Sequence, residues 1–237
     1  MFSSRRVRAV LCLAAGALLL AGCGDSGALR GAGPTATAVG PERLWPRLPP
    51  ASAPALDYGV AHTQTVKGVT VPGDDVHRVD PLAVVRAEVA AHPEAYAGPH
   101  AVYATTRERL QECGTKDGQG RCPLLRAYYR DLTGDGRDDL VLGIRFPGEQ
   151  LAVRVDTVEN HRLVQVMGTS DSVISVELAG RDVIIRSPST LPGYAFRTVW
   201  AWDPAQRAIL ATRDEILRVG TAPPRRPIAA GPPKSAR

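Results

Sequence analysis

Cys23 is the residue whose chemistry the sequence indicates most clearly. It ends the segment Leu20-Ala21-Gly22-Cys23, in which small residues precede a thiol. In exported proteins such a segment is a lipobox: the thiol receives a diacylglyceryl group, and cleavage before the cysteine makes it the new N-terminus. A basic region, Met1 to Arg8, and an apolar run, Val10 to Leu20, precede it, as in an export signal. We predict a lipoprotein signal peptide over residues 1–22 and a lipid on Cys23; a secretory signal with an incidental cysteine is the alternative.

The apolar run is too short to remain in the membrane as a span. Its eleven residues rise only ~16 Å as a helix, whereas the hydrocarbon core of a bilayer is about 30 Å thick. We therefore expect a lipid to hold the mature chain on the extracytoplasmic face of the plasma membrane, since each buried CH₂ of an acyl chain contributes ~0.8 kcal/mol. Arg5-Arg6 leaves a twin-arginine export route open beside the general one.

Cys113 and Cys122 form the second candidate for covalent chemistry. The chain has four cysteines; Cys12 leaves with the signal and Cys23 is acylated, so these two remain as a pair. Outside the cytosol such a pair is usually oxidised, and the three glycines between them let the chain fold back. We expect a disulfide, whose small loop contributes ~3 kcal/mol at most. Free thiols are one alternative and a metal held by the pair is another, although no histidine or second cysteine pair has ligand spacing.

An acidic segment, Asp131 to Asp139, has the oxygen spacing of a calcium loop. Positions 1, 3, 5 and 9 carry side-chain oxygens, position 6 is glycine, and position 7 would ligate through its carbonyl. The predicted ligands are Asp131, Thr133, Asp135, Arg137 and Asp139. Position 12 is Leu142, so the bidentate glutamate of a helix-loop-helix calcium hand is missing, and the loop is more similar to those of FG-GAP or VCBS repeats. The alternative is a hairpin connection in which the aspartates cap backbone amides.

The other polar and aromatic residues indicate no catalytic centre. The sequence has no G-x-S-x-G elbow, no S-x-x-K with a K-T-G partner, no H-E-x-x-H, no Walker loop and no GxGxxG after a strand. The five histidines are scattered, and Asp214-Glu215 is predicted to be a solvated strand edge. The aromatic strand face Phe196 to Trp202 is predicted to fill the core, with stacking on cell-wall sugars as the alternative. We predict that the protein is not an enzyme and requires no cofactor, with calcium as the one candidate.

The distribution of charge argues against a nucleic-acid partner. The 29 basic and 24 acidic residues give a net charge of +5. Three of the basic residues lie in the first eight positions, and four lie in a Pro-rich tail without acids, so the stretch between them carries −2. Such a nearly neutral body lacks the basic face that phosphates require. The predicted partner is the plasma membrane, through the lipid, and no nucleic acid.

The elements that must position these residues are expected to begin near residue 76. Residues 23–75 are rich in Pro, Ala and Gly and are predicted to be a tether. Packing of Leu44-Trp45 and of Val66 to Val71 on the domain as an added strand is the alternative. Residues 76–220 are predicted to form a globular domain, and residues 221–237 a disordered basic tail.

Periodicity within residues 76–220 predicts an α+β fold. Asp80-Pro81 has the pattern of a helix start, Pro93 ends that helix, and Val102 to Glu112 is a second one. Eight short strands with period two follow, at Leu125–Arg130, Leu140–Phe146, Leu151–Asp156, Leu163–Met167, Val173–Leu178, Val183–Arg186, Arg197–Trp202 and Ala208–Arg213. Because no helix separates them, we predict an antiparallel β-meander of about eight strands with two N-terminal helices on one face, in a single domain.

Between residues 110 and 205 the sequence resembles the actinobacterial cell-envelope-stress accessory lipoproteins, which are encoded beside an extracytoplasmic sigma factor and a two-component sensor pair. The matching segments are Tyr129 to Gly134, Leu140 to Leu142, Val176 to Leu178, Asp182 to Ile185 and Arg197 to Trp200. The resemblance implies a non-enzymatic, lipid-anchored regulator that lowers signalling by contact with a sensor kinase ectodomain. The alternative class is a calcium- or cell-wall-ligand-binding lipoprotein module.

Overall fold

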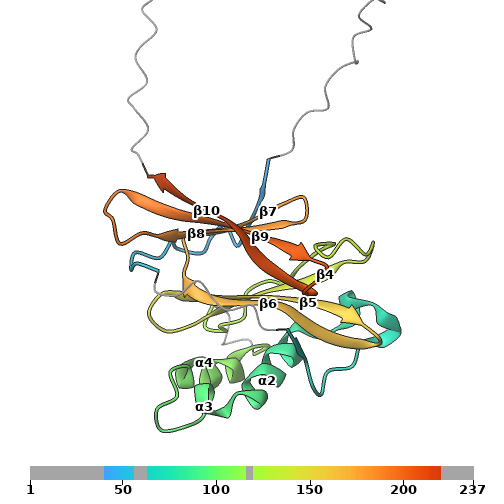
Figure 1. The fold of residues 1–237 in the computed structure, drawn as a ribbon. Helices are drawn as coiled ribbons and strands as arrows, with labels where there is room; N and C mark the ends of the chain where they lie inside the picture. The colour runs from blue at the N-terminus through green and yellow to red at the C-terminus, as the bar shows by residue number, and fades with distance from the viewer. Residues whose placement is uncertain (1–39, 56–62, 116–119, 220–237) are drawn as a thin grey trace, which may run out of the picture. The chain divides into compact units, whose positions relative to one another are not determined.

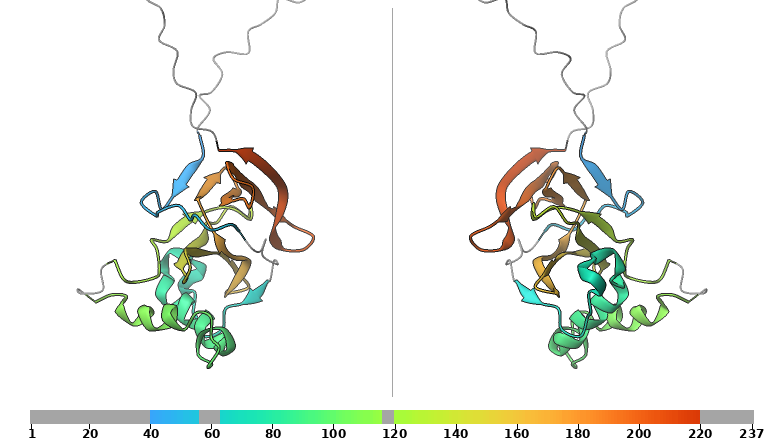
Figure 2. Two further views of the ribbon diagram at one scale, coloured as in Figure 1. Left: turned by 90° about the vertical axis from the view of Figure 1, so that its left-hand side faces the viewer. Right: turned by 90° about the vertical axis from the view of Figure 1, so that its right-hand side faces the viewer.

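Two antiparallel sheets and a group of short helices make up the described part of the chain (Figure 1). The computed structural model describes residues 40–55, 63–115 and 120–219. The predicted signal peptide, Cys23, the first part of the predicted tether and the predicted tail lie outside these ranges. The layers follow in the order sheet, sheet, helices, so that the helices cover the outer face of one sheet, as the two further views also show (Figure 2).

Each sheet has five strands, and the meander is divided between them. The first sheet has the order β1-β7-β8-β9-β10 and the second the order β2-β6-β5-β4-β3. The first contains β1 Glu42–Leu44, β7 Ser175–Ala179, β8 Asp182–Pro188, β9 Tyr194–Asp203 and β10 Ala208–Arg218. The second contains β2 Gln64–Thr65, β3 Tyr128–Arg130, β4 Asp139–Arg145, β5 Gln150–Glu159 and β6 Arg162–Ser172. The eight predicted strands are all present as β3 to β10, and the α+β prediction is confirmed.

The prediction that the whole of residues 23–75 is a tether is wrong for the described residues from 40 onward. Strand β1 pairs with β7 and strand β2 pairs with β6, so this segment does add strands to the sheets. The first, Glu42–Leu44, includes the predicted Leu44, whereas the second is Gln64–Thr65 and not Val66 to Val71. Trp45 is buried and its Nε1 donates to the Arg126 carbonyl at 2.7 Å. Its ring lies on Gly143, where an added Cβ would stand 2.6 Å from the indole. The domain therefore already includes β1 and does not begin at residue 76, because an aromatic anchor outweighs the Pro-rich composition around it.

The helices begin where the sequence predicts but divide into shorter pieces. Helix α2, Pro81–Ala91, begins after Asp80, whose side chain accepts from the Leu82 amide at 2.9 Å. Pro93 ends α2 but also starts α3, Pro93–Tyr96, because proline suits the first helical position. The second predicted helix is shorter than expected. It consists of α4, Ala104–Arg109, and the 3₁₀ turn Leu110–Glu112; two further 3₁₀ turns are Pro72–Asp74 and Val76–Arg78.

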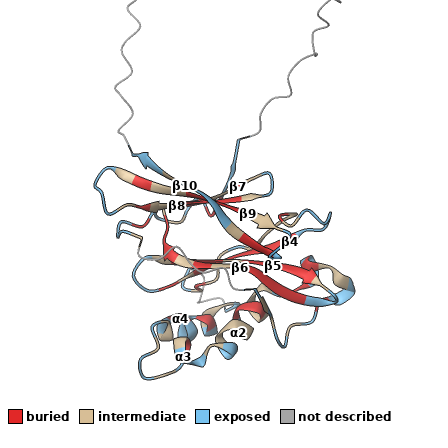
Figure 3. Cartoon of the chain, in the orientation of Figure 1, coloured by how far each residue is buried: buried red, intermediate tan, exposed pale blue. Residues whose placement is uncertain are grey.

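Buried residues run along the strands of the second sheet (Figure 3), and apolar side chains pack on both of its faces. Alternate residues of β4 point to opposite sides. Val141 joins the core between the sheets, whereas Leu140, Leu142 and Ile144 join the core beneath the helices. Each fully buried side chain of this kind contributes about 2 kcal/mol. Any charged residue on the helix-facing side of this sheet therefore lies in a poorly hydrated layer.

Candidate functional site

The acidic loop is the first predicted site, and its carboxylates are directed at backbone amides. Asp131 accepts from the amides of Gly134 and Gly136 at 2.6 and 3.1 Å. Asp139 Oδ2 accepts from the amides of Leu132 and Thr133 at 2.8 and 2.9 Å. Gly134 and Gly136 have φ values of 80° and 84°, which side chains with a Cβ rarely adopt. These contacts are those of the hairpin-connection alternative.

The remaining predicted ligands do not complete a metal cage as they are placed. Asp135 pairs with Arg137, whose Nη2 also donates to the Val158 carbonyl at 3.0 Å. Thr133 Oγ1 is buried without a hydrogen-bond partner among the described residues. Within residues 40–55, 63–115 and 120–219, no three His, Cys, Asp or Glu side chains are grouped to hold a metal ion. Calcium binding at this loop stays a prediction.

The other predicted sites have structural roles. Cys113 and Cys122 form the expected disulfide. Trp200 is only 3% exposed and lies in the core between the sheets, so for this residue the core prediction is confirmed and sugar stacking is excluded. Phe196 and Trp202 are half-buried, and sugar stacking through them stays an alternative. Glu215 pairs with Arg197 of the neighbouring strand at 2.9 Å, as expected of a strand edge.

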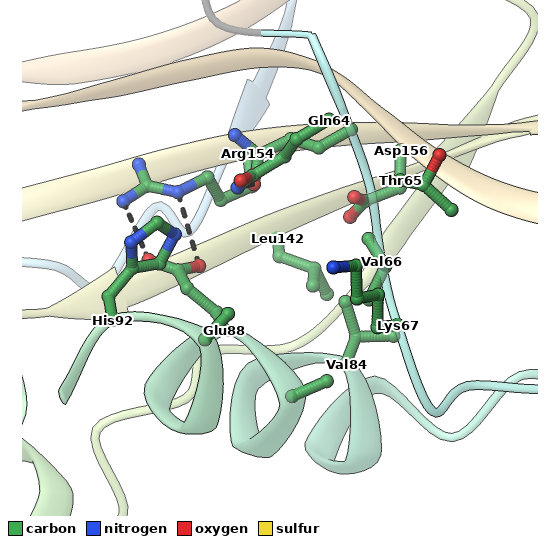
Figure 4. A pocket seen from close by; sticks show the side chains of 13 residues that line it. Gln64, Thr65, Val66, Lys67, Val84, Glu88, His92, Leu142, Arg154 and Asp156 are labelled. Atoms are coloured by element: carbon green, nitrogen blue, oxygen red, sulfur yellow. Dashed lines mark hydrogen bonds and ion pairs between the residues drawn. The ribbon is translucent and has the colours of Figure 1, made fainter.

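A cavity of about 490 Å³ lies between α2 and the outer face of the second sheet, and sequence analysis did not predict it (Figure 4). Its walls come from α2, from β4, β5 and β6, and from the segment that contains β2. Figure 4 shows Arg154 and His92 on one side of the cavity and Lys67 and Asp156 on the other. The walls of the cavity therefore come from chain segments that precede and follow the Cys113–Cys122 disulfide in the sequence.

A mostly buried ion pair forms one wall of this cavity. Arg154 of β5 binds Glu88 of α2 through two contacts, Nη2–Oε1 at 2.9 Å and Nε–Oε2 at 3.2 Å, and each side chain is 12% exposed. Arg154 Nη1 also donates to the Thr169 carbonyl at 2.7 Å, and the Tyr96 hydroxyl donates to Glu88 at 2.8 Å. Burial raises the pKa of Tyr96, so the hydroxyl stays a donor. The pair is mutually neutralised, and breaking it would leave a buried charge without a partner.

Asp156 is the unusual group in the cavity. It is 1% exposed, and neither carboxylate oxygen has a hydrogen-bond partner among the described residues. Burial raises the pKa of Asp156 to about 7, the negative charge of Glu88 adds to this, and Arg154 opposes it. Perturbed carboxylates of this kind cluster at functional sites, although structural networks also produce them.

The strand register explains why Asp156 faces the helices. The pairing register of β5 and β6 shifts between Val155 and Asp156. Asp156 therefore lies opposite Gln165, and Val166 is the extra residue on β6. Val153 and Val155 point into the core between the sheets, so Arg154 and Asp156 point the other way. The alternation Val153-Arg154-Val155-Asp156 was a visible signal, but a period of two does not tell a solvated face from one covered by a helix.

Comparisons with protein-family models, with curated proteins and with solved structures find no match for this chain. None of the helices in the described ranges has the length and apolar character that crossing a bilayer requires.

Proposed function

We propose that this protein is a lipid-anchored, extracytoplasmic, non-enzymatic regulator that lowers envelope-stress signalling by contact with a sensor kinase ectodomain. The lipobox at Leu20 to Cys23 supports the anchor, and the resemblance over residues 110–205 supports the regulatory role. The absence of catalytic motifs in the sequence favours contact over turnover as the mode of action.

The observation that carries the proposal is the short distance along the chain between the lipid and the domain. Cys23 precedes Gly40, the first described residue, by 17 positions. Even a fully extended chain of that length spans about 60 Å at most. Confinement to so thin a layer raises the effective concentration of the domain near any ectodomain in the same layer. A partner that binds only weakly in solution would therefore still be bound there. Release from the lipid would remove this advantage without changing the contact surface.

Strand β10 is the surface best suited to such a contact. The described strands at the other three sheet edges, β1, β2 and β3, have only two or three residues each, whereas β10 has eleven. Its far end exposes apolar side chains: Ile216 is 62% exposed, and Val219, just beyond the strand, is 60% exposed. A long edge can receive an extended segment of a partner as a further strand.

A reporter strain tests the proposal. Deleting the gene should raise basal transcription of the stress regulon, and wild-type protein should restore it. The Cys23→Ala protein should complement poorly because it is diluted away from the membrane. Ile216→Glu should also complement poorly, whereas Val102→Glu should complement fully, since Val102 is 69% exposed but lies by α4, away from β10.

Reporter activity equal to wild type in the deletion strain, with and without cell-wall antibiotics, would contradict the regulatory proposal. Full complementation by Ile216→Glu would leave regulation standing but exclude β10 as the contact surface.

A further inference from the structure

The cavity beneath α2 contains one acid and one base that lack ion-pair partners. Glu88 and Arg154 neutralise each other across its wall. Asp156 has no hydrogen-bond partner for either oxygen among the described residues. Lys67 lines the cavity at an exposed position and forms no ion pair within the described residues. A buried carboxylate without donors is costly, because it has lost its water and gained no hydrogen bond in exchange. A ligand that supplies donors would remove that cost.

The space between these two charges is bounded by apolar groups. Leu142 of β4 and Val84 of α2 are 1% and 4% exposed and line the cavity together with Val66. Figure 4 shows Leu142 and Val84 below the level of Asp156. The volume of about 490 Å³ is within the range of small-molecule sites, which combine an apolar lining with a few polar groups that fix orientation.

We propose that this cavity binds a small zwitterionic amino compound, the size of an amino acid or dipeptide, with its ammonium group on Asp156 and its anionic group toward Lys67. The site follows from the placement of the unpartnered carboxylate and the unpaired amine around one apolar surface. It does not depend on the regulatory function.

Charge complementarity favours a zwitterion over a simple anion or a simple amine. An ammonium group brings three donors to the two free oxygens of Asp156, and hydrogen bonds to charged groups are the stronger ones. A simple anion would meet Lys67 but would be repelled by the ionised carboxylate of Asp156. A simple amine would satisfy Asp156 but would gain nothing from the exposed ammonium group of Lys67. A zwitterion satisfies both, and its side chain covers Leu142 and Val84.

Direct binding to the detergent-solubilised full-length protein tests the proposal. The probes are the common amino acids in both enantiomers, together with dialanine, followed by thermal shift and by isothermal titration calorimetry at pH 8. At least one probe should bind. Its N-acetyl derivative, which lacks the ammonium group, should bind at least tenfold more weakly, because it cannot form charged hydrogen bonds to Asp156.

Variants connect the binding to the two named residues. Asp156→Asn keeps the side-chain volume and should lower the affinity at least tenfold, with circular dichroism as the check on folding. Lys67→Met changes an exposed position, so it should leave the core intact. It should lower the affinity for the zwitterion more than the affinity for its amide derivative, which lacks the anionic group. Asp214→Asn on β10 is the matched control and should bind like wild type.

Two results would overturn the proposal: no probe binding at 10 mM, or Asp156→Asn binding as tightly as wild type. Either result would leave the reporter experiment unaffected, so failure of the ligand site and failure of the regulatory function are distinguishable.

Discussion

Replacing Asp156 by asparagine should make the protein's stability less dependent on pH. Asp156 is 1% exposed and its oxygens have no donors among the described residues, so the folded state disfavours its charged form. Burial raises its pKa from 3.8 to about 7. Asparagine has nearly the same shape but does not titrate, so Asp156→Asn removes this effect and leaves the packing in place.

The sign and size of the effect follow from the two pKa values. Between about pH 4 and pH 7 the folded protein keeps the Asp156 proton, whereas the unfolded chain has lost it. The free energy of unfolding therefore falls as pH rises through this window, by about 1.4 kcal/mol per pH unit. The full contribution is present below pH 3.8 and is lost above pH 7. Wild type should lose about 3 kcal/mol between pH 4.5 and pH 8 through this one group.

Neighbouring charged groups belong to the same calculation. Glu88 of α2 raises the pKa of Asp156 further, Asp139 of β4 does so weakly, and Arg154 lowers it. Lys67 and His92 also line the cavity. All of them remain in the variant, so comparing wild type with Asp156→Asn isolates the single carboxyl group.

Urea denaturation at pH 4.5 and pH 8 measures the effect. From pH 4.5 to pH 8, the unfolding free energy of wild type should fall by about 3 kcal/mol more than that of Asp156→Asn. Asp214→Asn, an exposed position on β10, should behave like wild type. Parallel pH profiles for wild type and Asp156→Asn would refute the reasoning, since they would show that Asp156 is hydrated or already partnered in the folded state.

Three further predictions concern the anchor, the acidic loop and the N-terminal strand. Cys23→Ala should abolish incorporation of radiolabelled fatty acid, and label retained in the variant would exclude lipidation at this residue. Calcium bound to the Asp131–Asp139 loop should raise stability by ~1.4 kcal/mol at tenfold over its Kd. A thermal melt unchanged between EDTA and millimolar Ca²⁺ would leave only the hairpin connection. Trp45→Ala should lower the unfolding free energy by about 3–5 kcal/mol, because it opens a cavity over Gly143 and leaves the Arg126 carbonyl without its donor; a loss below about 1 kcal/mol would mean that residues 40–55 add little to the core.

The eight strands, the start of α2 and the disulfide could be predicted from sequence because each depends on local signals. Alternation of Leu140, Leu142 and Ile144 marks a strand wherever it packs, since neighbouring side chains on a strand point to opposite faces. Asp80 caps its helix through a contact two residues away. The predicted signal peptide over residues 1–22 and the predicted acylation of Cys23 likewise rest on linear motifs. Such features need no knowledge of what lies across the fold.

The division of the meander into two sheets, the packing of Trp45 on Gly143 and the burial of Asp156 could not be predicted in this way. Each depends on partners 60 or more residues away in the chain, as the contacts Trp45–Arg126 and Arg154–Glu88 show. A strand with one charged face has the same sequence pattern whether water or a helix covers that face. The sequence by itself thus determined the order of the elements and the linear motifs. Only the tertiary structure decided that the Asp156 carboxylate is shielded from water, because its hydration depends on which elements pack over β5.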